Sequence, residues 1–132
     1  YDVLEKNRGK VIYFDFWARW CPPCLAEMEP LKQLRSKFST DDLIIYSICV
    51  SEPKEQWEEC LNEYSLKNRG IECVHVTDYL GIDNYQKIRK QWKIDRMPYY
   101  ILINRQGQII DFGTAARPSN PQLVSRIEEA VK

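Results

Sequence analysis

Two cysteines separated by two prolines, Cys21 and Cys24, are the residues of this sequence best suited to carry out chemistry. They lie in the stretch FWARWCPPCLAEM, directly after an apolar run and directly before a helical pattern. A thiol at the start of a helix has a lowered pKa, because the free N–H groups and the helix dipole favour the thiolate. A second cysteine one turn later can close a disulfide with it. The spacing therefore predicts thiol–disulfide exchange, in which Cys21 attacks and Cys24 resolves the mixed disulfide.

Other uses of a C-x-x-C pair require features that are weak or missing here. A zinc site needs a second ligand pair, but neither C-x-x-C nor C-x-x-H recurs, and His75 is the sole histidine. A purely structural disulfide is disfavoured because so short a loop restricts the unfolded chain very little. Three alternatives stay open: a degenerate domain that has kept the motif without activity, a partner-binding module in which the pair only regulates docking, and transient Cu(I) handling by the two thiolates.

The residues around the cysteines predict how a substrate approaches them. Pro22 suits the first helical position, because its missing N–H would have no partner there. Together with Pro23 it shapes the turn, and we expect both prolines to face the substrate. Trp20 precedes Cys21 and is expected to form an exposed flat wall of the substrate groove. Trp17 is expected to pack beneath the active-site loop.

The elements that must position this pair alternate between strands and helices. Continuous apolar, β-prone runs predict buried strands, and apolar residues three and four apart predict helices. Such an order predicts a parallel core with right-handed crossovers, an antiparallel hairpin around Asn104–Gly107, and helices on both faces of the sheet. The expected strands are 11–17, 43–50, 71–76 (near an edge), 99–103 and 108–112, and the expected helices contain 2–8, 25–38, 57–64, 85–92 and 121–131.

Composition places the chain among ordinary globular proteins and excludes several classes of function. It has 132 residues, of which 44% are hydrophobic and 29% charged, as suits one domain with its own core. Its 19 basic and 19 acidic residues balance, and the sequence has no dense basic stretch that would predict nucleic-acid binding. No apolar run approaches the ~18 residues that cross a membrane. We expect a single domain, 1–132. Because the chain begins at Tyr1 rather than Met, we expect this domain to be a fragment or the C-terminal domain of a longer exported chain.

Two stretches resemble a known family. VIYFDFWARWCPPC closely resembles the active-site strand and loop of thioredoxin, and RMPYYILINRQGQII resembles the cis-proline and β-hairpin that form the family's second landmark. The match runs from about Lys10 to the C-terminus. Within the superfamily, LAEM, the extra segment 65–79 and ARPSNPQL resemble the TlpA/ResA-like bacterial thiol–disulfide oxidoreductases. The resemblance implies a thioredoxin-like three-layer α/β/α sandwich with a mixed central β-sheet.

The same resemblance assigns roles to individual residues. Cys21 matches the nucleophile and Cys24 the resolving thiol. Asp15, six residues before the first cysteine, matches the buried acid of thioredoxin. An acid inside an apolar strand is expected to have a raised pKa, and here it is expected to relay a proton to or from Cys24 through water. The alternative is an ordinary buried, hydrogen-bonded carboxylate. Pro98 matches the cis-proline beside the active-site disulfide, and Met97 is expected to offer its backbone to an extended substrate strand.

The resemblance also predicts how and where the protein works. It implies a monomeric reductase of protein disulfides that cycles between dithiol and disulfide and needs no cofactor or metal. Its partners are protein dithiols and disulfides and an upstream thiol electron donor, such as a membrane redox protein, with no nucleic acid. Members of this branch are typically exported, so we expect a periplasmic or other extracytoplasmic location, with a membrane anchor in the full-length protein. The adjacent prolines also resemble tryparedoxins and nucleoredoxins, which keeps a cytosolic redox protein as the alternative.

A few residues depart from the family pattern or stand outside the motif. The position of the family's helix proline is occupied by Glu29, and Pro30 follows, which predicts a kink shifted by one residue. Cys49 lies within an apolar run and is expected to be buried and inert. His75 is expected at the surface or partly buried, without a chemical role, and Trp92 is expected in the core. The direction of electron transfer stays open, because about 30 mV of reduction potential corresponds to only ~1.4 kcal/mol.

Overall fold

The computed structural model describes residues 2–50, 54–76, 82–91, 94 and 96–132. Its centre is a five-stranded sheet with the spatial order β3 (Ile71–His75), β2 (Leu43–Cys49), β1 (Val11–Trp17), β4 (Tyr99–Ile103) and β5 (Ile109–Gly113). β1 and β3 pair with β2 in parallel, whereas β4 runs antiparallel to both β1 and β5. The parallel core, the terminal hairpin and the edge position of β3 are therefore confirmed.

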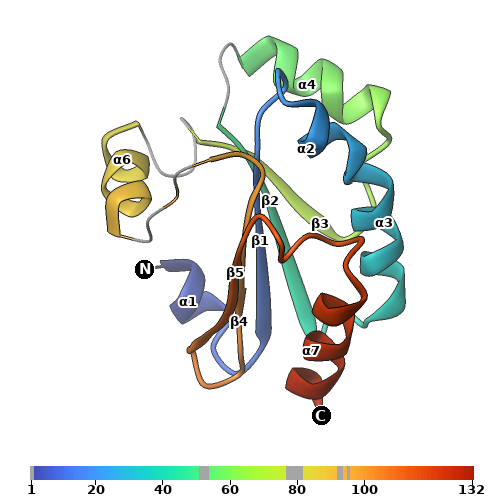
Figure 1. Ribbon diagram of the computed structural model, residues 1–132, viewed down its shortest axis with the longest axis vertical. Helices are drawn as coiled ribbons and strands as arrows, with labels where there is room; N and C mark the ends of the chain where they lie inside the picture. Colours follow the sequence, from blue (N-terminus) through green and yellow to red (C-terminus); the bar gives the residue numbers. More distant parts are fainter. Residues whose placement is uncertain (1, 51–53, 77–81, 92–93, 95) are drawn as a thin grey trace.

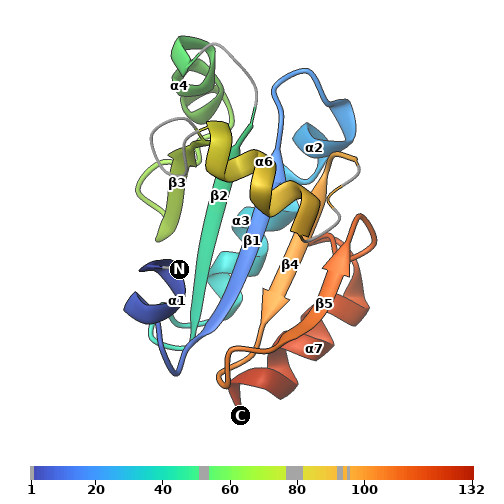
Figure 2. The same cartoon turned by 90° about the vertical axis from the view of Figure 1, so that its left-hand side faces the viewer.

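Helices cover both faces of the sheet and complete three layers (Figure 1; Figure 2). One face carries α1 (Asp2–Lys6) and α6 (Ile82–Gln91). The opposite face carries α2 (Pro22–Ala26), α3 (Met28–Lys37), α4 (Lys54–Glu63) and α7 (Pro121–Val131). This is the three-layer sandwich with a mixed sheet that the sequence predicts.

The central strand β1 is buried along its whole length, which explains its nearly continuous apolar run. Successive side chains of a strand point to opposite faces of the sheet. Tyr13 packs in the cluster with α3 and α7, whereas Phe14 and Phe16 pack in the cluster with α6. Asp15 is the acidic exception, and it shares its face with Tyr13 and Trp17. The acid predicted from the sequence thus lies inside the layer that also holds α2.

The helical segment that follows the cysteines is broken at Glu27, between α2 and α3. Pro30 lies in the first turn of α3, where it has no N–H to donate to the carbonyl of Ala26. Helical bonding resumes when the Leu31 N–H donates to the Glu27 carbonyl at 2.9 Å. The helical path is therefore interrupted for one residue before Pro30, which places Glu27 at the junction of two helices.

The loop 114–120 leads from β5 back to the face that carries α2 and α3 (Figure 1). Asn120 caps α7, since its side-chain oxygen accepts from the Gln122 N–H at 3.0 Å, and Pro121 takes the first helical position. The Asn120 amide also donates to the Ala115 carbonyl at 2.8 Å. These bonds give the loop a defined shape next to the active-site helix.

Candidate active site

Cys21 and Cys24 form a disulfide at the start of α2, with their Cα atoms 5.3 Å apart. Cys21 is the N-cap residue in an extended backbone conformation, and its Sγ accepts from the Cys24 N–H at 3.3 Å. Its carbonyl accepts from the Leu25 N–H at 3.1 Å, which begins the helix. Pro22 occupies the first helical turn, where no N–H is needed. The pair lies where the sequence predicts it, between the end of β1 and a helix N-terminus.

Around the disulfide, one tryptophan is buried and the other is exposed. Trp17 is completely buried in the apolar cluster that holds both cysteines, as expected of a residue beneath the loop. Trp20, by contrast, has 67% of its surface exposed, and both prolines of the motif, Pro22 and Pro23, are exposed as well. A largely apolar surface therefore adjoins the redox pair in the sequence and in space.

The Met97–Pro98 segment, predicted from the sequence as the second part of the site, lies at the same end of the sheet as the disulfide. Met97 is half-buried and packs against the cluster that holds Cys21 and Cys24. The peptide bond between Met97 and Pro98 is cis, and the Pro98 carbonyl accepts from Thr114 Oγ1 at 3.0 Å. The fold thus brings Met97 to the disulfide although the two are far apart in the sequence.

Asp15 is the buried acid of this region. It is only 4% exposed, and burial raises its pKa to about 7. The Ser47 hydroxyl donates to Asp15 Oδ2 at 3.5 Å and lowers the pKa, whereas the charge of Glu27 raises it. Asp15 shares its sheet face with Trp17, which packs in the disulfide cluster. A carboxyl whose pKa is about 7 exchanges its proton near neutral pH, as a proton relay requires.

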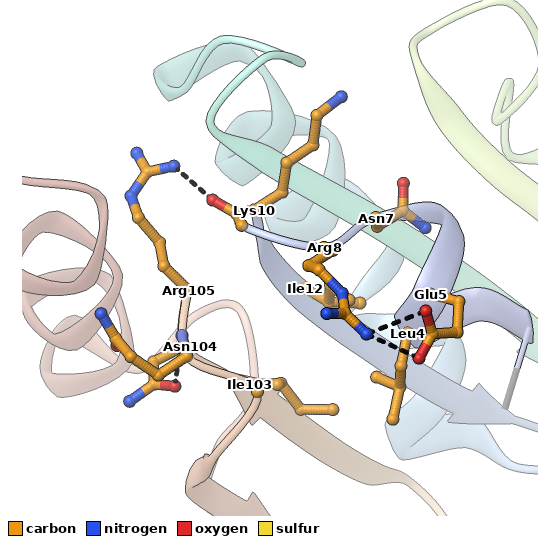
Figure 3. A pocket seen from close by; sticks show the side chains of 12 residues that line it. Leu4, Glu5, Asn7, Arg8, Lys10, Ile12, Ile103, Asn104 and Arg105 are labelled. Atoms are coloured by element: carbon orange, nitrogen blue, oxygen red, sulfur yellow. Dashed lines mark hydrogen bonds and ion pairs between the residues drawn. The ribbon is translucent and has the colours of Figure 1, made fainter.

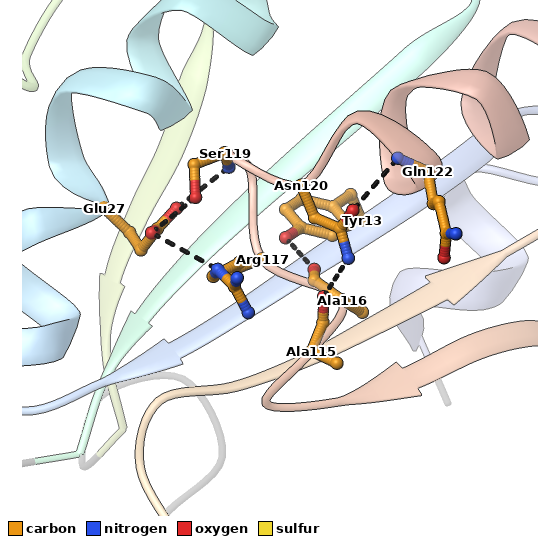
Figure 4. Close-up of polar contacts among 8 residues, drawn as sticks. All are labelled: Tyr13, Glu27, Ala115, Ala116, Arg117, Ser119, Asn120 and Gln122. Carbon is orange, nitrogen blue, oxygen red and sulfur yellow. Dashed lines mark hydrogen bonds and ion pairs between the residues drawn. The ribbon is translucent and has the colours of Figure 1, made fainter.

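Sequence reasoning missed Glu27, the residue at the break between α2 and α3. Its carboxylate accepts from the Ser119 N–H at 2.9 Å and from Ser119 Oγ at 2.8 Å, and Arg117 Nε lies 4.0 Å away (Figure 4). These contacts join the active-site helix to the loop before α7. The spacing could have indicated Glu27, because an acid three residues after Cys24 lies one helical turn further along the same helix face.

Two further neighbours of Asp15 come from other strands. Ser47 lies opposite Asp15 in the parallel register of β1 and β2, and Tyr100 lies opposite it in the antiparallel register of β1 and β4. Both side chains are buried, and the Tyr100 ring stacks on Tyr13 with the ring centroids 5.7 Å apart. A serine inside the apolar run LIIYSICV was a visible signal, but only the register of the strands pairs it with the acid.

The other three cysteines, Cys49, Cys60 and Cys73, form no disulfide and are packed in or against the same cluster as the Cys21–Cys24 pair. Cys49 is completely buried, as expected. Burial raises the pKa of Cys60, and it raises the pKa of Cys73 to about 11, with the charge of Asp15 adding to the effect. A thiol with a raised pKa stays protonated at neutral pH and is a poor nucleophile. Cys60 and Cys73 are thus protonated thiols at neutral pH, in contrast to the disulfide-bonded Cys21 and Cys24.

His75 lies in a different environment from the one expected. The sequence predicts a surface or partly buried side chain, but His75 is completely buried, so this expectation was wrong. It lies opposite Cys49 in the register of β2 and β3, and its ring centroid is 5.6 Å from that of Trp57 on α4. Helix α4 packs over the end of this edge strand and covers the imidazole. Trp92, expected in the core, lies outside the described residues.

A pocket of about 320 Å³ lies at the other end of β1, between α1 and the turn that follows β4 (Figure 3). Ile12, near the start of β1, lines it, whereas the disulfide follows the end of that strand. Two of its cationic side chains are already paired, Arg8 with Glu5 and Arg105 with Asp42. This pocket is therefore separate from the thiol site.

In the part of the chain that the structure describes, no three side chains of His, Cys, Asp or Glu gather in a way that could hold a metal ion. No described helix is both long and apolar enough to cross a membrane.

Comparison with known proteins shows which family this chain belongs to. A sequence model of the family described as Redoxin matches residues 1–131. The chain belongs to the Redoxin family. A curated relative of this redoxin, thiol-disulfide oxidoreductase ResA of Bacillus thuringiensis (strain Al Hakam), is 26% identical over 108 residues, or 82% of this chain. The matched part is 57% of that relative, so this redoxin spans little more than half of its length.

Solved structures share the fold of this redoxin. A proposed thiol-disulfide oxidoreductase of Bacteroides vulgatus, determined in solution, is 33% identical with a TM-score of 0.73, covering 96% of this chain and 76% of that one. A proposed thiol:disulfide interchange protein DsbE of Chlorobium tepidum shows the same fold at 20% identity, with a TM-score of 0.77 and coverage of 98% and 85%. The thioredoxin-like fold and the resemblance to TlpA/ResA-like oxidoreductases are confirmed.

Proposed function

We propose that this redoxin is a thiol–disulfide oxidoreductase that reduces disulfide bonds of other proteins. The observation that carries the proposal is the Cys21–Cys24 disulfide at the N-terminus of α2, on the sheet face that holds the buried Asp15. A nucleophilic pair at a helix start and an acid whose pKa is about 7 are the two groups that the reaction needs. The names of the ResA and Bacteroides relatives support the same activity.

The reaction starts from the reduced pair. The Cys21 thiolate attacks one sulfur of the substrate disulfide, which forms a mixed disulfide and releases the first substrate thiolate. The carboxylate of Asp15 takes the proton of the Cys24 thiol, and the Cys24 thiolate attacks Cys21 Sγ. This step closes the Cys21–Cys24 disulfide and releases the second substrate thiolate. Two electrons thus pass from the cysteine pair to the substrate.

The substrate in this proposal is an extended polypeptide segment that carries the disulfide. The exposed Trp20, Pro22 and Pro23 form part of its binding surface, and Met97, which packs against the disulfide cluster, forms another part. Backbone groups at Met97 and Pro98 hold the segment as an added strand. An upstream thiol donor returns two electrons to the pair, so that no bound cofactor takes part.

The protein works as a monomer outside the cytoplasm in this proposal, anchored through a part of the full-length chain. Fractionation of cells that express the full-length protein tests the location, and recovery in the cytosol would favour the tryparedoxin-like alternative. Size-exclusion chromatography with light scattering tests the monomer.

Reduction of insulin disulfides by the purified, reduced protein tests the activity. We expect multiple turnovers with wild type and with Cys49→Ser, a matched control at a buried cysteine outside the disulfide, and no turnover with Cys21→Ser. Equal rates for wild type and Cys21→Ser would overturn the catalytic proposal. Stoichiometric capture of substrate without turnover would favour the partner-binding module.

The direction of transfer is tested by the reduction potential, measured by equilibrating the Cys21–Cys24 pair in glutathione buffers. We expect a strongly reducing value, because a reductase must hold its electrons less tightly than its substrate. A potential near that of the oxidant DsbA, about −120 mV, would make the protein an oxidase instead.

A further inference from the structure

Tyr100 carries a buried hydroxyl that the mechanism above does not use. The residue is 1% exposed, and its hydroxyl has no hydrogen-bond partner among the residues that the structure describes. Leaving a buried hydroxyl without a partner is costly, and most such groups in proteins are satisfied. An unpaired hydroxyl beside a redox site therefore suggests a role in another charge state of that site.

The sheet places this tyrosine beside the buried acid. Tyr100 and Asp15 are direct register partners on the antiparallel strands β4 and β1. Opposite side chains of such a pair share one face of the sheet, with Cβ atoms about 4.5–5.5 Å apart. Both side chains therefore emerge side by side into the layer beneath α2 and α3.

A second tyrosine fixes the ring of the first. Tyr13 stacks on Tyr100 with ring planes only 5° apart, and the Tyr13 hydroxyl donates to the Ala116 carbonyl at 2.6 Å (Figure 4). This bond anchors Tyr13 to the loop before α7. Because the two rings pack face to face, the Tyr13 ring holds the plane of the Tyr100 ring beside the strand that carries Asp15.

The carboxylate acceptors near Tyr100 differ in how many hydrogen-bond donors they already bind. The Glu27 carboxylate already accepts two bonds from Ser119 and lies next to Arg117 (Figure 4). Asp15 accepts from Ser47 at 3.5 Å, a long bond that leaves most of the acceptor sites of an ionised carboxylate available. An ionised Asp15 is thus the acceptor with most capacity for another donor.

We propose that Tyr100 is a positioning residue whose buried hydroxyl acts as hydrogen-bond donor to Asp15 once Asp15 has lost its proton. This inference rests on the proposed thiol–disulfide exchange, in which ionised Asp15 accepts the proton of Cys24. Burial and the negative charges of Asp15 and Glu27 raise the pKa of Tyr100 far above its usual value, so the phenol remains a donor throughout the working pH range.

The charged and titratable groups around this pair come from every neighbouring element. The groups that face Tyr100 or Asp15 are Tyr13 on β1, Cys73 on β3, Glu27 between α2 and α3, and Arg117 in the loop before α7. Asp111 on β5 raises the pKa of Tyr13 and forms an ion pair with Arg126 of α7. Of these groups, Tyr100 is the one whose hydroxyl is both buried and unpaired within the described chain. It is therefore the group whose removal isolates the effect.

Two readouts on Tyr100→Phe test the proposal, with Tyr13→Phe as the matched control. The first is the carboxyl titration of Asp15 in the oxidised protein, followed by ¹³C NMR, and the second is the pH dependence of insulin reduction. A lost donor destabilises the ionised carboxyl, so both midpoints should move upward by about one pH unit in Tyr100→Phe. Tyr13→Phe, whose hydroxyl is occupied by Ala116, should leave both midpoints in place.

Unchanged midpoints in Tyr100→Phe, or equal shifts in the two variants, would overturn the proposal. A packing role predicts a different pattern, in which Tyr100→Phe loses stability in urea without moving either midpoint. Below the Asp15 midpoint, where the hydroxyl has no partner, we expect the stability of Tyr100→Phe to be unchanged or slightly higher, since removing an unpaired hydroxyl carries no bond cost. If the wild type does not reduce insulin, the proposed function fails, while the NMR titration still decides whether Tyr100 donates to Asp15.

Discussion

Ser47 and Asp15 lie directly opposite each other on the parallel strands β2 and β1, and the serine hydroxyl donates to the carboxyl at 3.5 Å. Cys73 continues this register beyond Ser47, and Tyr100 continues it on the other side of Asp15. A row of four polar or ionisable side chains thus crosses the sheet from β3 to β4. The charge state of the redox site depends on how this row holds the Asp15 proton.

Replacing Asp15 with asparagine should stabilise the fold at neutral and higher pH. Burial raises the folded-state pKa to about 7, whereas an unfolded aspartate titrates near ~3.9. Between these values the folded state binds more protons, so wild-type stability falls as pH rises from about 4 to about 7. Asp15→Asn lacks this loss. Its free energy of unfolding, relative to wild type, should therefore be about 2–4 kcal/mol higher at pH ~8 than at pH ~4. Urea unfolding at both pH values measures the gain, and a pH-independent difference would contradict it.

Replacing Ser47 with alanine should raise the pKa of Asp15, because the hydroxyl that favours the ionised carboxyl is lost. The bond is long, so the acid midpoint of the pH–rate profile should move upward by about half a pH unit. Ser36→Ala is a matched control, since that hydroxyl is exposed on α3 and donates to Gln33. A profile for Ser47→Ala that coincides with the control would show that the serine does not act on the acid.

Replacing Glu27 with glutamine should have two separable effects. Loss of the carboxylate weakens the contacts to Ser119 and Arg117, which should cost about 1–3 kcal/mol in the free energy of unfolding. Loss of the negative charge should lower the pKa of Asp15 and move the acid midpoint of activity downward. Glu29→Gln, two positions on and exposed, should change neither property. A midpoint that stays in place would argue against coupling between the two acids.

Replacing Cys24 with alanine should trap the intermediate. Without the resolving thiol, the mixed disulfide between Cys21 and a substrate cysteine persists and can be detected by non-reducing electrophoresis and mass spectrometry. The same experiment with Cys49→Ala should yield no trapped species, since the active pair is intact. Trapped substrate on any cysteine other than Cys21 would reverse the assignment of the nucleophile.

Local sequence patterns predicted most of the elements. The run VIYFDFW is apolar at nearly every position because β1 is covered on both faces, and such a pattern is visible without a structure. Asp15 was recognisable for the same reason, as one acid in that run. The buried position of His75 was not, because an edge strand gives no sign of whether a distant helix covers it. Glu27 was overlooked because its partner Ser119 lies 92 positions away in the chain.

The sequence by itself determined the redox pair, its place between strand and helix, the presence of a buried acid and the alternation of strands and helices. These are local properties, set by residue type, spacing and periodicity. Only the tertiary structure decided which residues act on the acid. Strand register brings Ser47 and Tyr100 to Asp15, and closure of the loop before α7 brings Ser119 to Glu27. Such pairings form only when the whole core packs, because residues far apart in the chain are aligned by the elements that carry them.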